Sequence, residues 1–145
     1  MRALGVDLGA RRIGVAVSDS AGTLASPIEV IERASSHRVD HERLRILADE
    51  WEAGYFVLGL PLSLDGTVGP AAQAVLDEAR ELAEATGLRV ELVDERLTTT
   101  QATRSLQEAG VSAREGRHIV DKVAAAVILQ AWLDRTRSPE TEPEP

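Results

Sequence analysis

Four acidic side chains are the residues of this chain best suited to chemistry. Asp7 lies inside the first apolar run, Asp94 and Glu95 end a later one, and Asp121 lies in a long helical pattern near the C-terminus. Carboxylates are typical ligands of Mg²⁺ and Mn²⁺, and Mg²⁺ in phosphate chemistry is held by a few of them together with water and substrate oxygens. Two such ions about 4 Å apart stabilise the attacking and leaving oxygens of a phosphodiester displacement. If the fold brings these acids together, they predict metal-dependent phosphodiester hydrolysis.

Each of these acids also has an ordinary structural interpretation. An acid inside an apolar strand is often an edge residue that faces water, and adjacent acids at a strand end are usually solvated. Asp121 lies at the border of a buried helical stripe, where Arg117 or Lys122 could pair with it. The prediction of a metal site therefore depends on the acids meeting in one topology. It leaves open whether Asp94 or Glu95 is the ligand and whether one or two ions bind.

The segment 5–19 around Asp7 predicts a hairpin with one apolar and one nearly bare surface. Alternation along its two strands directs branched aliphatic side chains to one face, and glycine, alanine, serine and Asp7 to the other. We interpret the bare face as clearance for a metal ion and a phosphate. Turn glycines let backbone amides approach an anion, and Arg11 and Arg12 in the turn could contact phosphates. The Pro- and Gly-rich loop 61–69 is a second candidate phosphate contact.

The remaining pattern predicts a mixed sheet flanked by helices. Strands are expected at 24–31, 55–60 and 88–94, and amphipathic helices at about 39–53, 72–86 and 115–135. Positions 120, 123, 124, 127, 128 and 131 form the buried stripe of the last helix. A capping box at 98–101 predicts a further short helix that ends at Gly110. This order is that of the ribonuclease H-like fold, an α/β architecture with a five-stranded mixed sheet. We expect one domain over residues 1–137 and a disordered acidic tail over 138–145.

Composition limits the classes of function. The chain of 145 residues is 43% hydrophobic, carries a net charge of −8 and has only 3% aromatic residues, too few for the base-stacking platform of an RNA-recognition motif. The absence of cysteine excludes disulfides and thiolate metal sites, and no apolar run has membrane-spanning length, so we expect a cytoplasmic protein. His37 and His41 are one helical turn apart. They and His118 show no zinc spacing with other ligands, and we assign them a structural role.

Basic residues near the predicted acids are candidate nucleic-acid contacts. Arg96 follows the adjacent pair of acids, and Arg117 and Lys122 flank Asp121. Together with Arg11 and Arg12 they would give the acidic site the positive rim that binding to phosphates requires.

Four segments resemble, in order and spacing, the motifs of the YqgF/RuvX family, bacterial relatives of the Holliday-junction resolvase RuvC. They are GVDLGARRIGVAVSD, VLGLPLSLDGT, VDERLTTTQA and VDKVAAAVILQ, and the similarity extends over residues 4–132. The resemblance implies a ribonuclease H-like fold and a nuclease that hydrolyses phosphodiester bonds with Mg²⁺ or Mn²⁺.

Carried over residue by residue, the resemblance implies catalytic and metal-binding roles for Asp7, Glu95 and Asp121, with Asp94 beside them. The RuvC relatives have a further acid one turn along the last helix, where this chain has alanines at 124 and 125. The full set of four acids is therefore absent, so this chain lacks one of the acids that could help to hold a second metal ion.

Three functions follow as hypotheses. The first is maturation of the 5′ end of pre-16S rRNA, with ribosomal precursor particles as candidate partners. The second is resolution of branched DNA, which needs two active sites in a symmetric homodimer because two strands are cut. The third is a non-catalytic module that binds nucleic acid or the ribosome. The sequence leaves open whether the chain is a monomer or a homodimer.

Overall fold

The computed structural model describes residues 1–96 and 113–136, with side chains for 1–96 and 123–136. Its centre is a five-stranded sheet with the spatial order β3-β2-β1-β4-β5. The strands are β1 (Arg2–Leu8), β2 (Arg12–Ser18), β3 (Ala25–Glu32), β4 (Ala53–Leu60) and β5 (Arg89–Asp94). The predicted helix after residue 98 and the predicted tail at 138–145 lie outside the described residues.

The sheet joins an antiparallel meander to two parallel strands, as the sequence predicted. Strand β1 pairs antiparallel with β2 and parallel with β4, and β4 pairs parallel with β5. The register between β2 and β3 shifts next to Ala16, which is paired with Pro27. A proline cannot donate to a ladder, so its place in the edge strand β3 at an irregularity follows from its chemistry.

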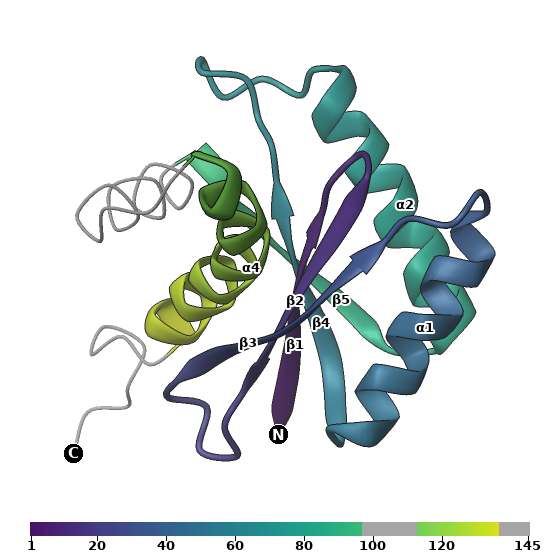
Figure 1. Cartoon of the computed structure of the whole chain (residues 1–145), viewed down its shortest axis with the longest axis vertical. Helices are drawn as coiled ribbons and strands as arrows, with labels where there is room; N and C mark the ends of the chain where they lie inside the picture. The colour runs from purple at the N-terminus through teal and green to yellow at the C-terminus, as the bar shows by residue number, and fades with distance from the viewer. Residues whose placement is uncertain (97–112, 137–145) are drawn as a thin grey trace.

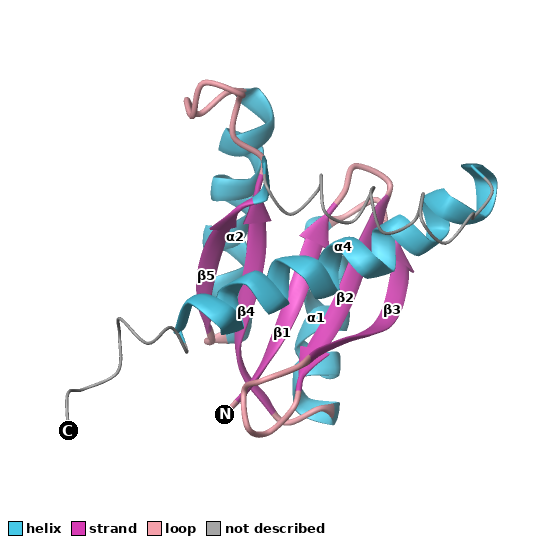
Figure 2. Cartoon of the chain, turned by 90° about the vertical axis from the view of Figure 1, so that its left-hand side faces the viewer, coloured by secondary structure: helices cyan, strands magenta, loops and turns pink. Residues whose placement is uncertain are grey.

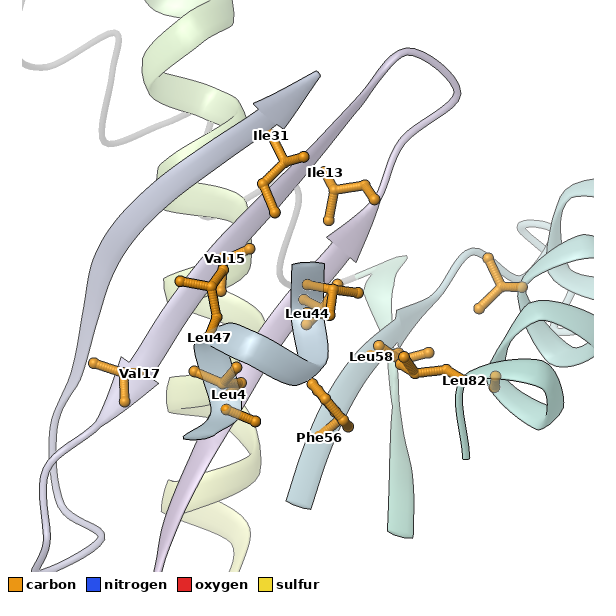
Figure 3. Close-up of a cluster of buried hydrophobic side chains, with 14 residues drawn as sticks. Leu4, Ile13, Val15, Val17, Ile31, Leu44, Leu47, Phe56, Leu58 and Leu82 are labelled. Atoms are coloured by element: carbon orange, nitrogen blue, oxygen red, sulfur yellow. The ribbon is translucent and has the colours of Figure 1, made fainter. Parts of the chain in front are cut away.

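Two helices, α1 (His37–Glu50) and α2 (Pro70–Thr86), cover one face of the sheet (Figure 1). Ser36 caps α1 by accepting a hydrogen bond from the Arg38 amide, and α2 ends at Gly87, whose φ of 73° favours glycine. Between these helices and the sheet lies the larger core, shown in Figure 3. Its fully buried side chains include Leu4, Phe56 and Leu58. Each contributes roughly 1.5–3 kcal/mol by leaving water.

The third described helix, α4 (Ala113–Thr136), crosses the opposite face of the sheet (Figure 2). It covers the face on which the alternation in the sequence places glycine, alanine, serine and Asp7. A Cβ atom on Gly5 would lie 2.6 Å from Leu129 Cβ and 2.8 Å from the Ala125 carbonyl oxygen. At Gly5, therefore, the interpretation of the bare face as clearance for a ligand was wrong: the small residues allow a helix to pack close to the strand backbone.

The buried side of α4 also differs from the predicted stripe. Ile128 is buried as predicted, but the residues buried with it are Ala125, Leu129 and Leu133. The predicted positions 123, 124, 127 and 131 are only partly buried, and 120 lies outside the described side chains. Gly5 and Gly59 determine the rotation of α4 about its axis, because each leaves room for a side chain of the helix. Hydrophobicity alone does not identify which side of the helix these side chains define.

Candidate active site

Asp7 lies near the carboxyl end of β1, on the face that α4 covers. It is partly buried and pairs across the antiparallel ladder with Gly14. Val6 is the partner of Leu58 in β4, so continuing this register by one residue places Asp7 beside Gly59. Side chains of neighbouring residues in parallel strands point to the same face, with the strands about 4.8 Å apart. A side chain at position 59 would therefore stand directly next to the Asp7 carboxylate.

The Glu95 carboxylate occupies that place. A Cβ atom on Gly59 would lie 2.8 Å from Glu95 Oε2 and 2.6 Å from Ile128 Cδ1. Glu95, which directly follows β5, thus extends over the bare backbone of β4 toward β1. The fold thus places the Glu95 carboxylate over Gly59 of β4, the register neighbour of Asp7 in β1, although the two acids are 88 positions apart in the sequence.

Asp94 lies on the other face of the sheet. It pairs with Leu60 in the β4–β5 ladder, in the alternation that places Leu58 and Leu92 toward α1 and α2. Both of its carboxylate oxygens accept hydrogen bonds from the Arg96 guanidinium, with Nε 3.0 Å from each oxygen, and these bonds lower the pKa of Asp94. Arg96 also donates from Nη1 to the Leu64 carbonyl oxygen at 3.1 Å. This pair ties the loop 61–69 to the end of β5.

Asp121 belongs to α4, one turn before Ala125. Trp132 donates a hydrogen bond to the Tyr55 hydroxyl near the start of β4, whereas Ile128 lies against Gly59 near its end. The N-terminal direction of α4 therefore leads toward the carboxyl ends of β1 and β4. Asp121 is about 6 Å further along the axis than Ala125. Its side chain, like those of Arg117 and Lys122, lies outside the described residues.

The predicted phosphate turn between β1 and β2 is tightly built. A Cβ atom on Gly9 would lie 2.5 Å from the Arg12 carbonyl oxygen, so this position requires glycine. Arg11 is exposed and Arg12 is partly buried. Arg33 holds the turn from the side: its Nε donates to the Gly9 carbonyl oxygen at 2.9 Å, and its amide donates to the Arg11 carbonyl oxygen at 2.8 Å.

Arg33 is also the centre of a buried ion-pair cluster under the turn. Its guanidinium donates to both oxygens of Glu78, at 2.8 and 2.9 Å, and to Asp40 at 3.3 Å. Burial by itself raises the pKa of Glu78, but the hydrogen bonds from Arg33 and His41 outweigh it, and the pKa lies below its ordinary value. A cavity of about 460 Å³ opens beside this cluster, between the Gly9 turn and α2.

The same cluster contains a group of potential metal ligands that sequence reasoning missed. His37, His41 and Glu78 each offer an atom within 4.8 Å of the others. The spacing of the two histidines was the available signal, but their carboxylate partner is 37 residues away on another helix. This group lies between α1 and α2, on the opposite side of the sheet from Asp7.

A family comparison agrees with this architecture. Residues 1–135 match the RuvX family, described as a Holliday junction resolvase. The chain belongs to the RuvX family. A relative from Myxococcus xanthus, named "Putative pre-16S rRNA nuclease", is 48% identical over 145 residues, which is 100% of this chain and 95% of that protein. A relative of the same name from Anaeromyxobacter is 49% identical over 134 residues, 92% of this chain and 97% of its own length. The resemblance predicted from the four motifs is thereby confirmed, and the relatives' names agree with a nuclease.

Solved structures confirm the ribonuclease H-like fold. RuvC of Thermus thermophilus, in complex with a Holliday junction substrate, superimposes on this RuvX protein with a TM-score of 0.56 at 16% identity, over 94% of this chain and 96% of that one. The large terminase nuclease of the thermophilic phage G20c gives a TM-score of 0.52 at 15% identity, over 87% and 80%. Among the described residues, none of the helices is long and apolar enough to cross a membrane.

Proposed function

We propose that this RuvX protein is a Mg²⁺- or Mn²⁺-dependent nuclease that acts in maturation of the 5′ end of pre-16S rRNA. The observation that carries the proposal is the position of the Glu95 carboxylate over Gly59, next to Asp7. The rRNA substrate is supported by the names of relatives that are nearly half identical over almost the whole chain.

The donor set fits a hard divalent cation. Asp7 is held by a central strand, and Glu95 reaches the same face across a glycine, so the two supply carboxylate oxygens of the kind such ions prefer. Asp121, brought to this edge by α4, is the proposed third ligand. Asp94 is not proposed as a ligand, because it lies on the face of the sheet opposite to Asp7 and Glu95. An ion bound here would supply an activated water for attack on phosphorus.

The remaining residues of the site orient the nucleic acid. Arg11 projects from the rigid turn that follows Asp7, and we assign it and Arg12 to phosphate contacts, together with Arg117 and Lys122 of α4. Arg96 is assigned to the rim as well, where its bond to the loop 61–69 fixes its direction. We place the reaction in the cytoplasm, on rRNA precursors or the particles that contain them.

The proposal is tested by cleavage of a pre-16S 5′ leader RNA and of a four-way DNA junction, each with Mg²⁺ or Mn²⁺. The wild type should cut the leader, and Asp7→Asn should abolish the cut while circular dichroism shows an intact fold. Asp77→Asn is the matched control, because the partners of this exposed acid within the described part of the chain are Gln73 and Arg80 on its own helix. Undiminished cleavage by Asp7→Asn overturns the metal site. Cleavage of the junction but not of the RNA overturns the substrate.

A further inference from the structure

The clearest unassigned feature of the molecule is the contact between His37 and His41 of α1 and Glu78 of α2. His41 Nε2 lies 2.9 Å from Glu78 Oε2, and His37 Nε2 lies 3.9 Å from Glu78 Oε1. His41 and Glu78 are buried, whereas the His37 side chain is 56% exposed. Ligand atoms around a tetrahedral Zn²⁺, with bonds of about 2.0–2.2 Å, are themselves a little over 3 Å apart. The three side chains therefore need only small shifts in position to share one ion, together with movement of the His41 proton from Nε2, which donates to Glu78, to Nδ1.

The orientation of His37 is fixed in the way that metal-ligating histidines usually are. Its Nδ1 lies 2.8 Å from the Glu81 carboxylate, one turn along α2 from Glu78. A proton on Nδ1 that is donated to Glu81 leaves the lone pair on Nε2, the atom that faces Glu78. A carboxylate behind a ligating histidine selects this tautomer and increases the basicity of the ligand.

The charged side chains around the two histidines also favour the binding of a cation. Asp40, Glu78 and Glu81 contribute three carboxylates, and Arg33 is the guanidinium that pairs with the first two. With neutral imidazoles the cluster carries an excess of two negative charges. The same excess raises the pKa of His37, chiefly through its hydrogen bond to Glu81. A divalent cation would balance the cluster without either histidine being protonated.

The site is open to an incoming ion. A cavity of about 360 Å³ is lined by His37, His41 and Glu81, and the 460 Å³ cavity on the other side is lined by His37 and Glu78. Water or an anionic group could occupy a fourth position from either cavity. Arg33 need not leave, because a carboxylate has lone pairs enough to accept from a guanidinium and bind a metal ion at once.

We propose that His37, His41 and Glu78 form a binding site for a borderline divalent cation of the Zn²⁺ class. The mixture of two imidazoles and one carboxylate is a donor set of zinc sites and differs from the all-carboxylate set that suits Mg²⁺. The ion cross-links α1 to α2. Through the bonds of Arg33 to both Glu78 and the Gly9 carbonyl oxygen, it also stabilises the turn that follows Asp7. The site is independent of the proposed nuclease metal.

The test is a titration of the untagged, chelator-treated full chain with Co²⁺, read by visible absorption. The Asp7→Asn chain serves as the background, so that binding at the nuclease site does not contribute. We expect the intense bands of low-coordinate Co²⁺, displacement by Zn²⁺, and a higher Tm with Zn²⁺. His37→Gln should abolish the bands, and we expect this variant to fold because the replaced side chain is 56% exposed. Glu81→Gln should weaken binding about tenfold or more, because the outer carboxylate is lost.

Glu84→Gln, an exposed acid on the same helix, is the matched control and should bind as tightly as its parent. Absence of the bands, or equal Co²⁺ affinity in His37→Gln and its parent, overturns the proposal and leaves the cluster as a set of hydrogen-bonded ion pairs. Neither result depends on nuclease activity, so failure of this site and failure of the proposed function are distinguishable.

Discussion

The substitution Gly59→Ala tests directly whether the position of Glu95 matters. The new methyl group would lie 2.8 Å from Glu95 Oε2 and 2.6 Å from Ile128 Cδ1, closer than atoms of these kinds approach. Both atoms are at the ends of side chains, so they can move while the backbone stays in place. The carboxylate would then leave its position next to Asp7, and we expect a large loss of cleavage with a small loss of stability.

The loss of stability and the loss of cleavage rate have different physical causes. An added methylene in a packed core costs about 1–3 kcal/mol, and replacing glycine by alanine returns about 0.4–1 kcal/mol through the unfolded chain. The net cost is therefore about 0–2.6 kcal/mol, and for a domain of this size each kcal/mol lowers the Tm by roughly 3 °C. A displacement of about 1 Å in a catalytic group can lower the rate about 100-fold. Activity should fall far more than the Tm predicts.

The assay is single-turnover cleavage of the pre-16S leader beside a thermal unfolding curve. Gly54→Ala is the matched control, because it makes the same change in the same strand, and the three atoms nearest to the new methyl group all belong to the exposed, flexible side chain of Met1. We expect the Gly54 variant to cleave at the wild-type rate. If Gly59→Ala also cleaves at that rate, Glu95 does not act from the position that the structure shows.

Three further results are expected. Arg33→Met should lower the free energy of unfolding in urea by about 3–5 kcal/mol, because it leaves the buried Glu78 carboxylate without its cation; a loss below about 1 kcal/mol would contradict this. Gly5→Ala should lower both the Tm and the cleavage rate, because the clash with Leu129 Cβ moves α4 as a whole. An unchanged rate in a destabilised protein would show that cleavage does not depend on the position of α4. The free energy of unfolding should fall as the pH drops below about 4.5, because Glu78, whose pKa is lowered in the folded protein, then becomes protonated. It should also fall as the pH rises above 6.5, because His37, whose pKa is raised in the folded protein, then loses its proton. In urea unfolding measured at each pH, His37→Gln should remove only the second decline.

Much of the fold follows from local patterns in the sequence. The alternation around Asp7, the helical period before Trp51 and the glycine at 87 all mark elements that the structure contains, with ends that differ by a few residues. The rotation of α4 was not predictable in this way. It depends on glycines at 5 and 59, which come from two different strands and accept the helix together.

The site was predictable in part. Alternation along β5 places Asp94 on the same face of the sheet as Leu92 and on the face opposite to Val93. Once it is known which face Leu92 packs against, this alternation indicates that Asp94 and Glu95 point to different faces. The role of Gly59 in giving room to Glu95 has no signature beyond a glycine in an apolar strand. The cluster around Arg33 was missed because its members come from three separate elements, and no spacing within one segment reveals it.

The two cores of the sheet become complete at different times during synthesis. Among the described side chains, the buried members of the core beneath α1 and α2 lie between Leu4 and Leu82, whereas the core beneath α4 also needs Ala125 to Leu133. A chain that emerges from the ribosome N-terminus first can therefore close one layer while the other side of its sheet is still uncovered. Asp7 is present at that stage, whereas Glu95, which lies 13 positions after Leu82, and the helix that carries Asp121 follow later. The nascent chain would thus acquire its proposed third metal ligand only when α4 is added.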